Sequence, residues 1–371
     1  MSRGQLPYTW VDSDASLASA SKHWAKASVV GMDIEFVRFN TYYPQAAIYQ
    51  IASEATIDLI DAPAIKDFAP LIELLGTERV LKVIHGGGED MEVIRTHLGM
   101  MARNLFDTQL AACIAGGGWS VGYATLVSDR LGVELSKEAQ RSDWLARPLT
   151  RAQLEYCQQD VAYLIELRDI LDRELERLGR FEWFEEEMRH WLGREEVPPE
   201  GRYLKIAGVR QMAPRQQAVL KALCEWRELE AMRTDTPRQW VVRDEHLSRF
   251  ARHERLDRSV IGNALPPHVA KRHGSGLLKA FEAGKASEVP VELAQPSAYG
   301  SREIVKSILK GIAVIADDLN IPPELLGRRR EIERCVRAWQ SGDRQPDYLS
   351  GWRNPYLRSL FDAAFDAGQC A

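Results

Sequence analysis

Four acidic residues in three separate segments are the side chains of this sequence best suited to chemistry. Asp33 and Glu35 lie two apart in an apolar run, Asp90 follows a run of glycines, and Asp160 lies further along the chain. Carboxylates in apolar surroundings are costly to desolvate and repel one another unless cations compensate them. Hard divalent cations take oxygen ligands, and two of them together can cleave a phosphodiester bond. These residue types therefore indicate a metal-dependent phosphodiesterase.

The spacing of these residues places them in pairs. Asp33 and Glu35 fall in a predicted strand, where alternate residues point to the same face of a sheet. Tyr156 and Asp160 are four apart on a predicted helix, so they also share a face. Each pair alone is common in proteins that have no such site. The prediction depends on their order along the chain, and only tertiary folding can bring the two faces together.

The elements that must position these side chains alternate between strands and helices. Apolar runs and turn residues predict a helix, three consecutive strands, and then alternating helices and strands. This order is typical of an α/β domain in which helices flank a mixed sheet. The predicted strands are 29–37, 47–52, 56–60, 80–84 and 104–107, and the predicted helices are 12–25, 69–75, 90–98, 108–114 and 150–178.

A cluster of proline and glycine at 197–201 predicts a domain boundary after residues 1–200. Two segments of similar length follow, at 208–288 and 291–371, and their periodic apolar residues predict helices. We expect each segment to form a small all-α domain.

The net charge of −5 is the sum of two parts with opposite signs. Residues 1–200 contain 20 Lys+Arg and 32 Asp+Glu, while residues 201–371 contain 28 and 21, so the parts carry −12 and +7. The acidic part could bind cations, and the basic part could bind a polyanion. A solvated charged surface is the alternative. The basic residues that could hold such a polyanion are Lys205, Arg210, Arg215, Lys271, Arg272 and Arg328–Arg330.

The composition is that of an ordinary globular protein, with 45% apolar and 27% charged residues. No apolar run reaches the roughly 18 residues of a membrane span, and the first residues lack the apolar core of a signal peptide. Five cysteines without close pairs favour a reducing compartment over disulfides or a zinc site. We therefore expect a cytoplasmic protein with no membrane partner, and a monomer.

The order Asp-x-Glu, then Asp, then Tyr-x-x-x-Asp resembles the tyrosine-bearing branch of the DEDD exonuclease superfamily. With the overall length, the surrounding segments resemble bacterial ribonuclease D; they are 33–38, 41–45, 85–90, 106–109 and 141–150. Segments of the basic part resemble the HRDC domains of that family; they include Trp226-Arg227, Val241-Val242, Asp244–Leu247 and Gly351–Arg353. The resemblance covers nearly the whole chain, and all five active-site positions are filled.

The resemblance implies an RNase H-like fold followed by two HRDC-like domains, and 3′→5′ hydrolysis of RNA to nucleoside 5′-monophosphates. It implies trimming of tRNA precursors, which no residue of the chain shows. Two divalent ions, Mg²⁺ or Mn²⁺, would be held by Asp33, Glu35, Asp90 and Asp160. Tyr156 takes the position that orients the attacking water. With an ordinary pKa near 10, a tyrosine is a poor base at neutral pH, so its hydroxyl is better suited to hydrogen bonding.

Further candidates for contact with RNA lie near these positions. Cations interleaved with an aromatic residue suit phosphate contact and base stacking, and this set comprises Lys137, Gln140, Arg141, Trp144 and Arg147. A solvated loop around one buried tryptophan is the alternative. His85 is also a candidate, although local hydrogen bonds are the preferred interpretation for it. We expect Asp107 to cap the helix that begins at Thr108.

Other activities fit parts of the sequence. The glycines after His85 and the pattern Gly118-Trp119-Ser120-Val121-Gly122 formally match an esterase, but the strand that must precede its nucleophile is missing, because 111–115 predicts a helix end. A DNA-directed exonuclease shares the carboxylates, and the residues reveal no preference for a 2′-hydroxyl. A binding protein with a dead nuclease site is disfavoured, because every active-site position is filled.

Overall fold

The structure, a computed structural model, describes residues 6–136, 139, 142–193, 197–289 and 301–369. The chain divides into two compact units. The first contains Met1–Val37, Pro44–Gly193 and Tyr299–Ala371, and the second contains Arg38–Tyr43 and Arg194–Ala298. Both units are therefore assembled from segments that are not contiguous in the sequence.

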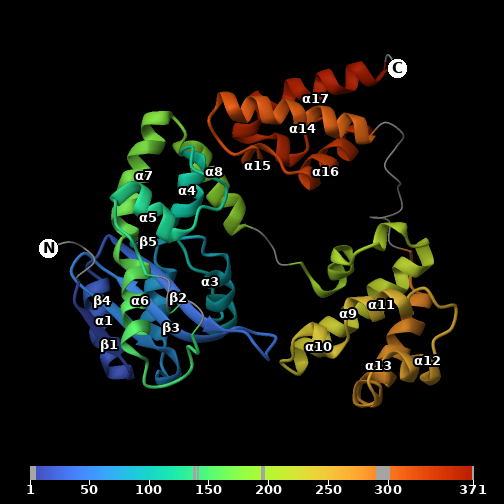
Figure 1. The fold of residues 1–371 in the computed structure, drawn as a ribbon, viewed down its shortest axis with the longest axis horizontal. Helices are drawn as coiled ribbons and strands as arrows, with labels where there is room; N and C mark the ends of the chain where they lie inside the picture. Colours follow the sequence, from blue (N-terminus) through green and yellow to red (C-terminus); the bar gives the residue numbers. More distant parts are fainter. Residues whose placement is uncertain (1–5, 137–138, 140–141, 194–196, 290–300, 370–371) are drawn as a thin grey trace. The chain divides into compact units, whose positions relative to one another are not determined.

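The first unit contains a six-stranded mixed sheet with the order β1-β4-β3-β2-β5-β6 (Figure 1). β3 pairs antiparallel with β2 and β4, while the β1–β4, β2–β5 and β5–β6 pairs are parallel. The strands are β1 (Tyr8–Val11), β2 (Val29–Val37), β3 (Gln45–Ala52), β4 (Ile57–Asp61), β5 (Leu81–Ile84) and β6 (Leu105–Asp107). The predicted mixed sheet is confirmed, with β1 as a strand that the sequence analysis missed.

Helices cover both faces of this sheet. They are α1 (Asp14–Trp24), α2 (Ala69–Gly76), α3 (Gly88–Val93) with the π-helix Ile94–Leu98, α4 (Thr108–Ile114), α5 (Tyr123–Leu131), α6 (Arg151–Ala162), α7 (Leu164–Leu178) and α8 (Phe181–Leu192). α6 and α7 pack on the face of β2 that carries Asp33. α1 covers the other face, where Trp24 donates a hydrogen bond to Asp58 of β4 (2.8 Å).

The single helix predicted over 150–178 is wrong, because the structure has two helices that meet at Tyr163. The hydroxyl of Tyr123 interrupts the backbone hydrogen bonds of the helix at this point. It accepts a hydrogen bond from the Tyr163 N–H (3.2 Å) and donates one to the Gln159 carbonyl (3.1 Å). An inserted hydroxyl that takes over an i→i−4 bond is a recognised cause of helix kinks. The direction of the chain therefore changes three residues after Asp160.

The C-terminal helices belong to the same unit as the sheet. They are α14 (Ser301–Asp318), α15 (Pro323–Leu326), α16 (Arg329–Gln340) and α17 (Asn354–Gln369), and their buried apolar residues join one continuous core with the sheet. Arg353 pairs with Glu187 of α8, and the ring of Trp352 stacks on Trp183 at 4.5 Å. The predicted domains 1–200, 208–288 and 291–371 stay predictions, because the division into two compact units does not test them.

The second unit is helical and has its own core. Its helices are α9 (Pro214–Arg233), α10 (Arg238–Val241), α11 (Asp244–Phe250), α12 (Arg258–Ala264) and α13 (Pro267–Ala286). α13 packs along α9, where a β-carbon on Gly284 would lie 2.6 Å from the Val219 Cα. Within the described ranges, no helix has the length and apolar character needed to cross a membrane.

Candidate active site

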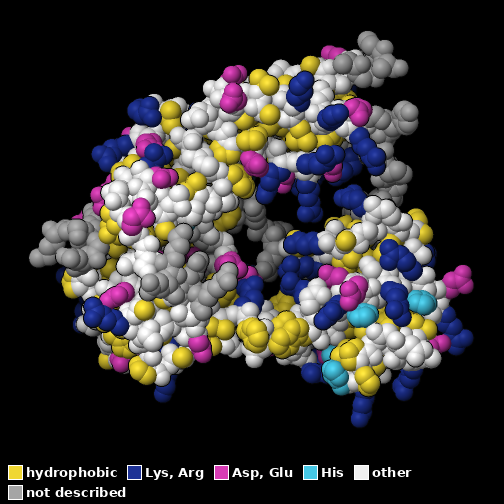
Figure 2. Space-filling view, viewed as in Figure 1, with side chains coloured by type: hydrophobic (Ala, Val, Ile, Leu, Met, Phe, Trp, Pro, Cys, Tyr) yellow, Lys and Arg dark blue, Asp and Glu magenta, His cyan; other side chains and the backbone are white. Residues whose placement is uncertain are grey.

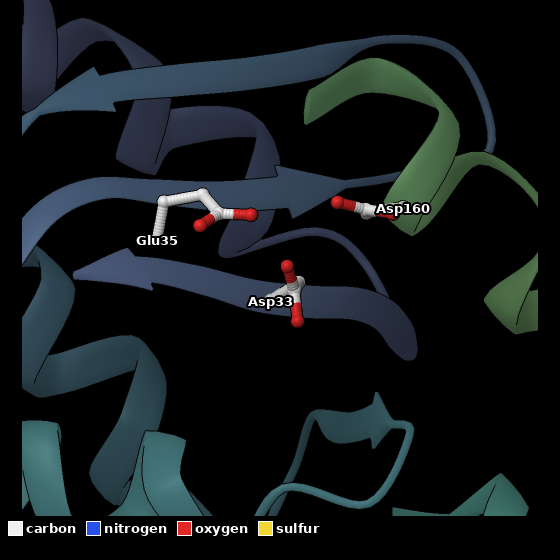
Figure 3. Close-up of side chains that lie close together, drawn as sticks. All are labelled: Asp33, Glu35 and Asp160. Atoms are coloured by element: carbon white, nitrogen blue, oxygen red, sulfur yellow. The ribbon is translucent and has the colours of Figure 1, made fainter. Parts of the chain in front are cut away.

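Three of the predicted carboxylates converge on one point. Asp33 and Glu35 project from β2, and Asp160 projects towards them from α6 (Figure 3). One carboxylate oxygen from each lies within 4.8 Å of the others. The strand contributes two of the carboxylates through its alternation, and the helix contributes the third through tertiary packing. The arrangement suits a divalent cation, which prefers several carboxylate oxygens.

The electrostatics of this cluster favour the binding of positive charge. Burial raises the pKa of Asp33 to about 6. Burial and the neighbouring carboxylates of Asp33, Asp160 and Asp90 raise the pKa of Glu35 to about 10. The pKa of Asp160 also lies well above its ordinary value, through burial and the charge of Asp33. Without cations the cluster therefore retains protons at neutral pH.

Asp90 lies beside this cluster rather than within it. It occupies the first turn of α3, directly after β5, and is 8% exposed. Burial and the charge of Asp33 raise its pKa well above the ordinary value. The turn before it is tight, since a β-carbon on Gly87 would lie 2.6 Å from the Ile84 side chain. Asp90 is thus close enough to Asp33 for the two carboxylates to interact electrostatically.

Tyr156 faces the cluster from α6, one turn before Asp160. Burial and the charges of Asp160 and Glu35 raise its pKa, so the phenol stays protonated. The buried ring of Trp144 lies 5.8 Å from the Tyr156 ring and limits its movement. Tyr156 is therefore a hydrogen-bond donor at this site.

The sequence analysis missed Gln50, which pairs with Asp33 across β2 and β3. Its side chain is fully buried, and both amide atoms lack a hydrogen-bond partner within 3.5 Å. The amide nevertheless acts on Asp33 and lowers its pKa, against the larger effect of burial. A glutamine in an otherwise apolar strand, opposite the predicted acidic strand, was the available signal.

A β-bulge follows Glu35 in the same pair of strands. Glu35 pairs with Ile48, but Phe36 pairs with Ala46, so Ala47 is the extra residue. Bulges are frequent beside active sites because they redirect side chains. The carbonyl of Ala47 accepts a hydrogen bond from Arg147 (3.2 Å).

Arg147 was predicted to contact RNA, and the structure gives it other partners. Its guanidinium donates to Asp61, to Ala47 and to the carbonyls of Trp144 and Ala146. These hydrogen bonds use all five N–H donors of an arginine. The guanidinium has no donor left for a phosphate in this arrangement, and it ties the segment before α6 to β3 and β4.

The other predicted RNA contacts have different surroundings. His85 uses both ring nitrogens, on Thr108 Oγ1 (2.9 Å) and on the Val121 carbonyl (2.9 Å), which supports the preferred interpretation of local hydrogen bonds. Trp144 is buried. Lys137, Gln140 and Arg141 lie outside the described residues. Asp107 caps α4 by accepting from the N–H groups of Gln109 and Leu110, as predicted.

The structure contradicts the esterase alternative. Gly118–Gly122 lies in the connection between α4 and α5, so a helix precedes Ser120 where a nucleophile elbow needs a strand. The imidazole of His85 contacts Thr108 and the Val121 carbonyl, so neither ring nitrogen is paired with Ser120.

Comparisons with known proteins agree with this site. Residues 8–176 match the 3′-5′ exonuclease family, residues 216–280 match the HRDC domain, and residues 299–360 match the ribonuclease D C-terminal HRDC domain. The chain is 34% identical to ribonuclease D of Serratia proteamaculans, over 95% of this chain and 97% of that one. It is also 34% identical to ribonuclease D of Escherichia coli, over 95% and 96%.

A solved structure supports the same assignment. The crystal structure of Escherichia coli RNase D, an exoribonuclease involved in structured RNA processing, superposes with a TM-score of 0.88. Its sequence is 32% identical, and the match covers 98% of this chain and 99% of that one. The fold and the acidic site define a 3′-5′ exonuclease. The chain belongs to the bacterial ribonuclease D family, so it is a 3′-5′ exoribonuclease.

Proposed function

We propose that this exoribonuclease shortens RNA from the 3′ end by two-metal hydrolysis and releases nucleoside 5′-monophosphates. The observation that carries the proposal is the buried convergence of Asp33, Glu35 and Asp160 within 4.8 Å. Burial, and then the repulsion between carboxylates at this spacing, raises the pKa values of Glu35 and Asp160. A site built this way gains stability when cations enter it.

The donor set fits divalent metal ions. It offers only carboxylate oxygens, and one of them, Asp160 Oδ2, is buried without a hydrogen-bond partner. Asp33, Glu35, Asp90 and Asp160 would together hold two ions, Mg²⁺ or Mn²⁺. When bound, such ions activate water and stabilise the negative charge that develops on the phosphate.

The remaining chemistry falls to residues of the chain. Tyr156 keeps its proton, so it positions the attacking water by donating or accepting a hydrogen bond and does not act as a base. Trp144 supports the Tyr156 ring from behind. Gln50 lies opposite Asp33, and the bulge directly follows Glu35, so both are placed to influence the two strand carboxylates.

A timed digestion tests the proposal. A 5′-labelled tRNA with a 3′ extension is incubated with Mg²⁺ or Mn²⁺, beside a DNA of the same sequence, and the products are resolved by length and by mass. We expect stepwise shortening of the RNA and release of 5′-monophosphates. Release of 3′-monophosphates, or equal activity in excess chelator, would refute two-metal hydrolysis.

A substitution separates chemistry from binding. Asp160→Asn removes one charge and keeps the shape, so we expect turnover to fall by at least a thousandfold. RNA affinity measured in chelator should change less than threefold, and the affinity for Mn²⁺ measured by calorimetry should fall. Normal turnover with weakened RNA binding would remove Asp160 from the metal site.

We propose tRNA precursors as substrates. Trimming of tRNA precursors is supported by the resemblance and by the structured RNA on which the Escherichia coli relative acts. RNA contacts by His85, Lys137, Gln140, Arg141, Trp144 and Arg147 stay predictions, as do the cytoplasmic location and the monomeric state. RNA binding by the basic residues after residue 201 also stays a prediction.

A further inference from the structure

Two large aromatic side chains of the second unit meet at its surface. Phe39 lies between β2 and β3 and is 78% exposed, while Trp240 of α10 is 56% exposed. Their rings are perpendicular, with centroids 6.2 Å apart. Exposed hydrophobic side chains are visible at the end of the β2–β3 hairpin (Figure 2). Adjacent exposed aromatic rings contribute little to folding and commonly mark a binding site.

The chain holds this pair of rings in place. In the same loop, the N–H groups of Tyr42 and Tyr43 donate to Asp235 Oδ1 at 2.9 and 3.0 Å. The Tyr42 hydroxyl donates to the fully buried Glu228 (2.6 Å), which also pairs with Arg238. Arg238 begins α10, two residues before Trp240. The two rings are therefore fixed through neighbouring residues on both sides, and a ligand would find them already arranged.

The charge of this unit indicates the ligand. Residues 201–298 contain 17 Lys+Arg and 11 Asp+Glu, a net charge of +6. Lys and Arg side chains are prominent over this unit (Figure 2). A basic surface with exposed aromatic rings suits single-stranded nucleic acid, whose phosphates meet the cations and whose bases stack on the rings. An apolar protein partner would gain nothing from the excess of cations.

We propose that Phe39 and Trp240 form a stacking site for unpaired bases of the RNA substrate. The proposal rests on RNA being the substrate. The covalent chain limits how far such a site can lie from the chemistry. Phe39 follows Glu35 by four residues, and a fully extended chain advances at most ~3.6 Å per residue, so their Cα atoms lie within about 14 Å. A stacked strand rises ~3.4 Å per nucleotide and covers that distance in about four nucleotides.

The test compares RNA length and base content. The full chain and its Phe39→Ala and Trp240→Ala variants bind labelled unstructured RNAs of 3 and 12 nucleotides in chelator, where no cleavage occurs. We expect each variant to raise the Kd of the 12-mer by about fivefold or more, and to raise the Kd of the 3-mer much less. Leu229→Ala, which removes another exposed hydrophobic side chain of this unit, is the matched control and should leave both values unchanged.

A second arm separates bases from phosphates. A 12-mer with abasic residues four to six nucleotides from its 3′ end keeps every phosphate. The wild-type protein should bind it about fivefold more weakly than the intact 12-mer, whereas Trp240→Ala should bind the two alike. Trp240→Phe, which keeps an aromatic ring, should restore most of the preference for bases.

Two results would overturn the stacking site. One is a Kd for the 12-mer that is the same in both alanine variants as in the wild type, with unchanged melting temperatures. This result would indicate that the two rings bind a protein partner instead of RNA. The other is an equal loss for intact and abasic RNA in the variants. Wild-type protein that fails to shorten the 12-mer with Mg²⁺ would instead count against the proposed function, so the two failures are distinguishable.

Discussion

Gly31 of β2 lies against Val161, where α6 ends beside the sheet. A β-carbon on Gly31 would lie 3.1 Å from the Val161 carbonyl oxygen and 3.1 Å from the Leu164 Cβ. Both distances are shorter than an ordinary van der Waals contact. Gly31 is two residues before Asp33, and Val161 directly follows Asp160. The close approach of strand and helix at this point sets the separation of the segments that carry Asp33 and Asp160.

Enlarging this residue should therefore reduce turnover. Gly31→Ala forces the helices outward by a few tenths of an ångström and moves Asp160 with them. We expect kcat to fall by roughly tenfold, and Gly31→Val to cost more, because small misplacements in an active site are expensive. Gly262→Ala in α12 meets nothing within 4 Å and is the control. Equal kcat values for Gly31→Val and wild type would refute this coupling.

Metal binding should release protons. In the metal-free protein the pKa of Glu35 is about 10, so Glu35 is protonated at pH 7, and a metal ligand must be deprotonated. Calorimetry of Mn²⁺ binding at pH 7, in buffers of different ionisation enthalpy, should show release of at least one proton. Metal affinity should rise with pH. A binding enthalpy that is independent of the buffer would contradict the protonated cluster.

The same shift sets a pH dependence of stability. The pKa of Glu35 is about 10 when folded, against an ordinary value of 4.5, so the folded state holds the extra proton between these values. The free energy of unfolding of the metal-free protein should therefore fall as pH rises from 4.5 towards 10. Chemical denaturation at pH 5, 7 and 9 measures this trend. Excess Mg²⁺ should flatten it, and Glu35→Gln should reduce it.

Tyr156→Phe should slow hydrolysis without abolishing metal binding. The variant keeps the ring against Trp144 and loses only the hydroxyl that we propose positions the water. We expect kcat to fall by roughly a hundredfold or more with a nearly unchanged KM. Tyr163→Phe at the helix junction is the control. A near-normal rate would remove the Tyr156 hydroxyl from the mechanism.

Arg147 offers a direct choice between a structural role and an RNA contact. Arg147→Lys keeps the charge but cannot reproduce five hydrogen bonds, so we expect the free energy of unfolding to fall by roughly 2–4 kcal/mol. Arg151→Lys, in an exposed ion pair, should change it little. A variant with unchanged stability and a higher KM for RNA would favour the contact predicted from the sequence.

The ion pair between Glu187 and Arg353 should be needed for the stability of the first unit. Arg353 also donates to the Leu325 carbonyl, and Glu187 accepts from Trp352 Nε1 (2.9 Å). Arg353→Met leaves the largely buried Glu187 without its cation and with only the Trp352 hydrogen bond, so we expect a loss of about 2–4 kcal/mol. Arg358→Met breaks an exposed pair with Asp362 and should cost less than about 1 kcal/mol. Equal melting temperatures for the two variants would contradict this.

The sequence was enough to predict the mixed sheet, apart from β1, and the acidic residues that converge on one point, because both depend on short-range patterns. Alternation places Asp33 and Glu35 on one face, and helical spacing does the same for Tyr156 and Asp160. The break at Tyr163 escaped prediction, since it depends on a hydroxyl from Tyr123, forty residues away. Gly31 carried a usable signal, because an isolated glycine within a strand often marks close approach of another segment.

The grouping of the C-terminal helices also depends on tertiary contacts. The sequence shows a proline and glycine cluster near 200 and helical periodicity beyond it, which predicts separate modules. The burial of Trp352 against Trp183 and the pairing of Arg353 with Glu187 are invisible to such patterns. The hydrogen-bond partners of Arg147 are equally invisible in the sequence, where a cation in a polar segment looks available for phosphate, and its RNA contact stays a prediction.

The first unit takes its core from both ends of the chain, and this affects how it is made. Translation proceeds at roughly 5–20 residues per second, so the ribosome needs on the order of ten seconds or more to add the 178 residues between Gly193 and Ala371. During that interval, the apolar surface of α8 that later packs against Trp352 has no cover. A nascent chain of this protein is therefore expected to engage chaperones until its last helices emerge.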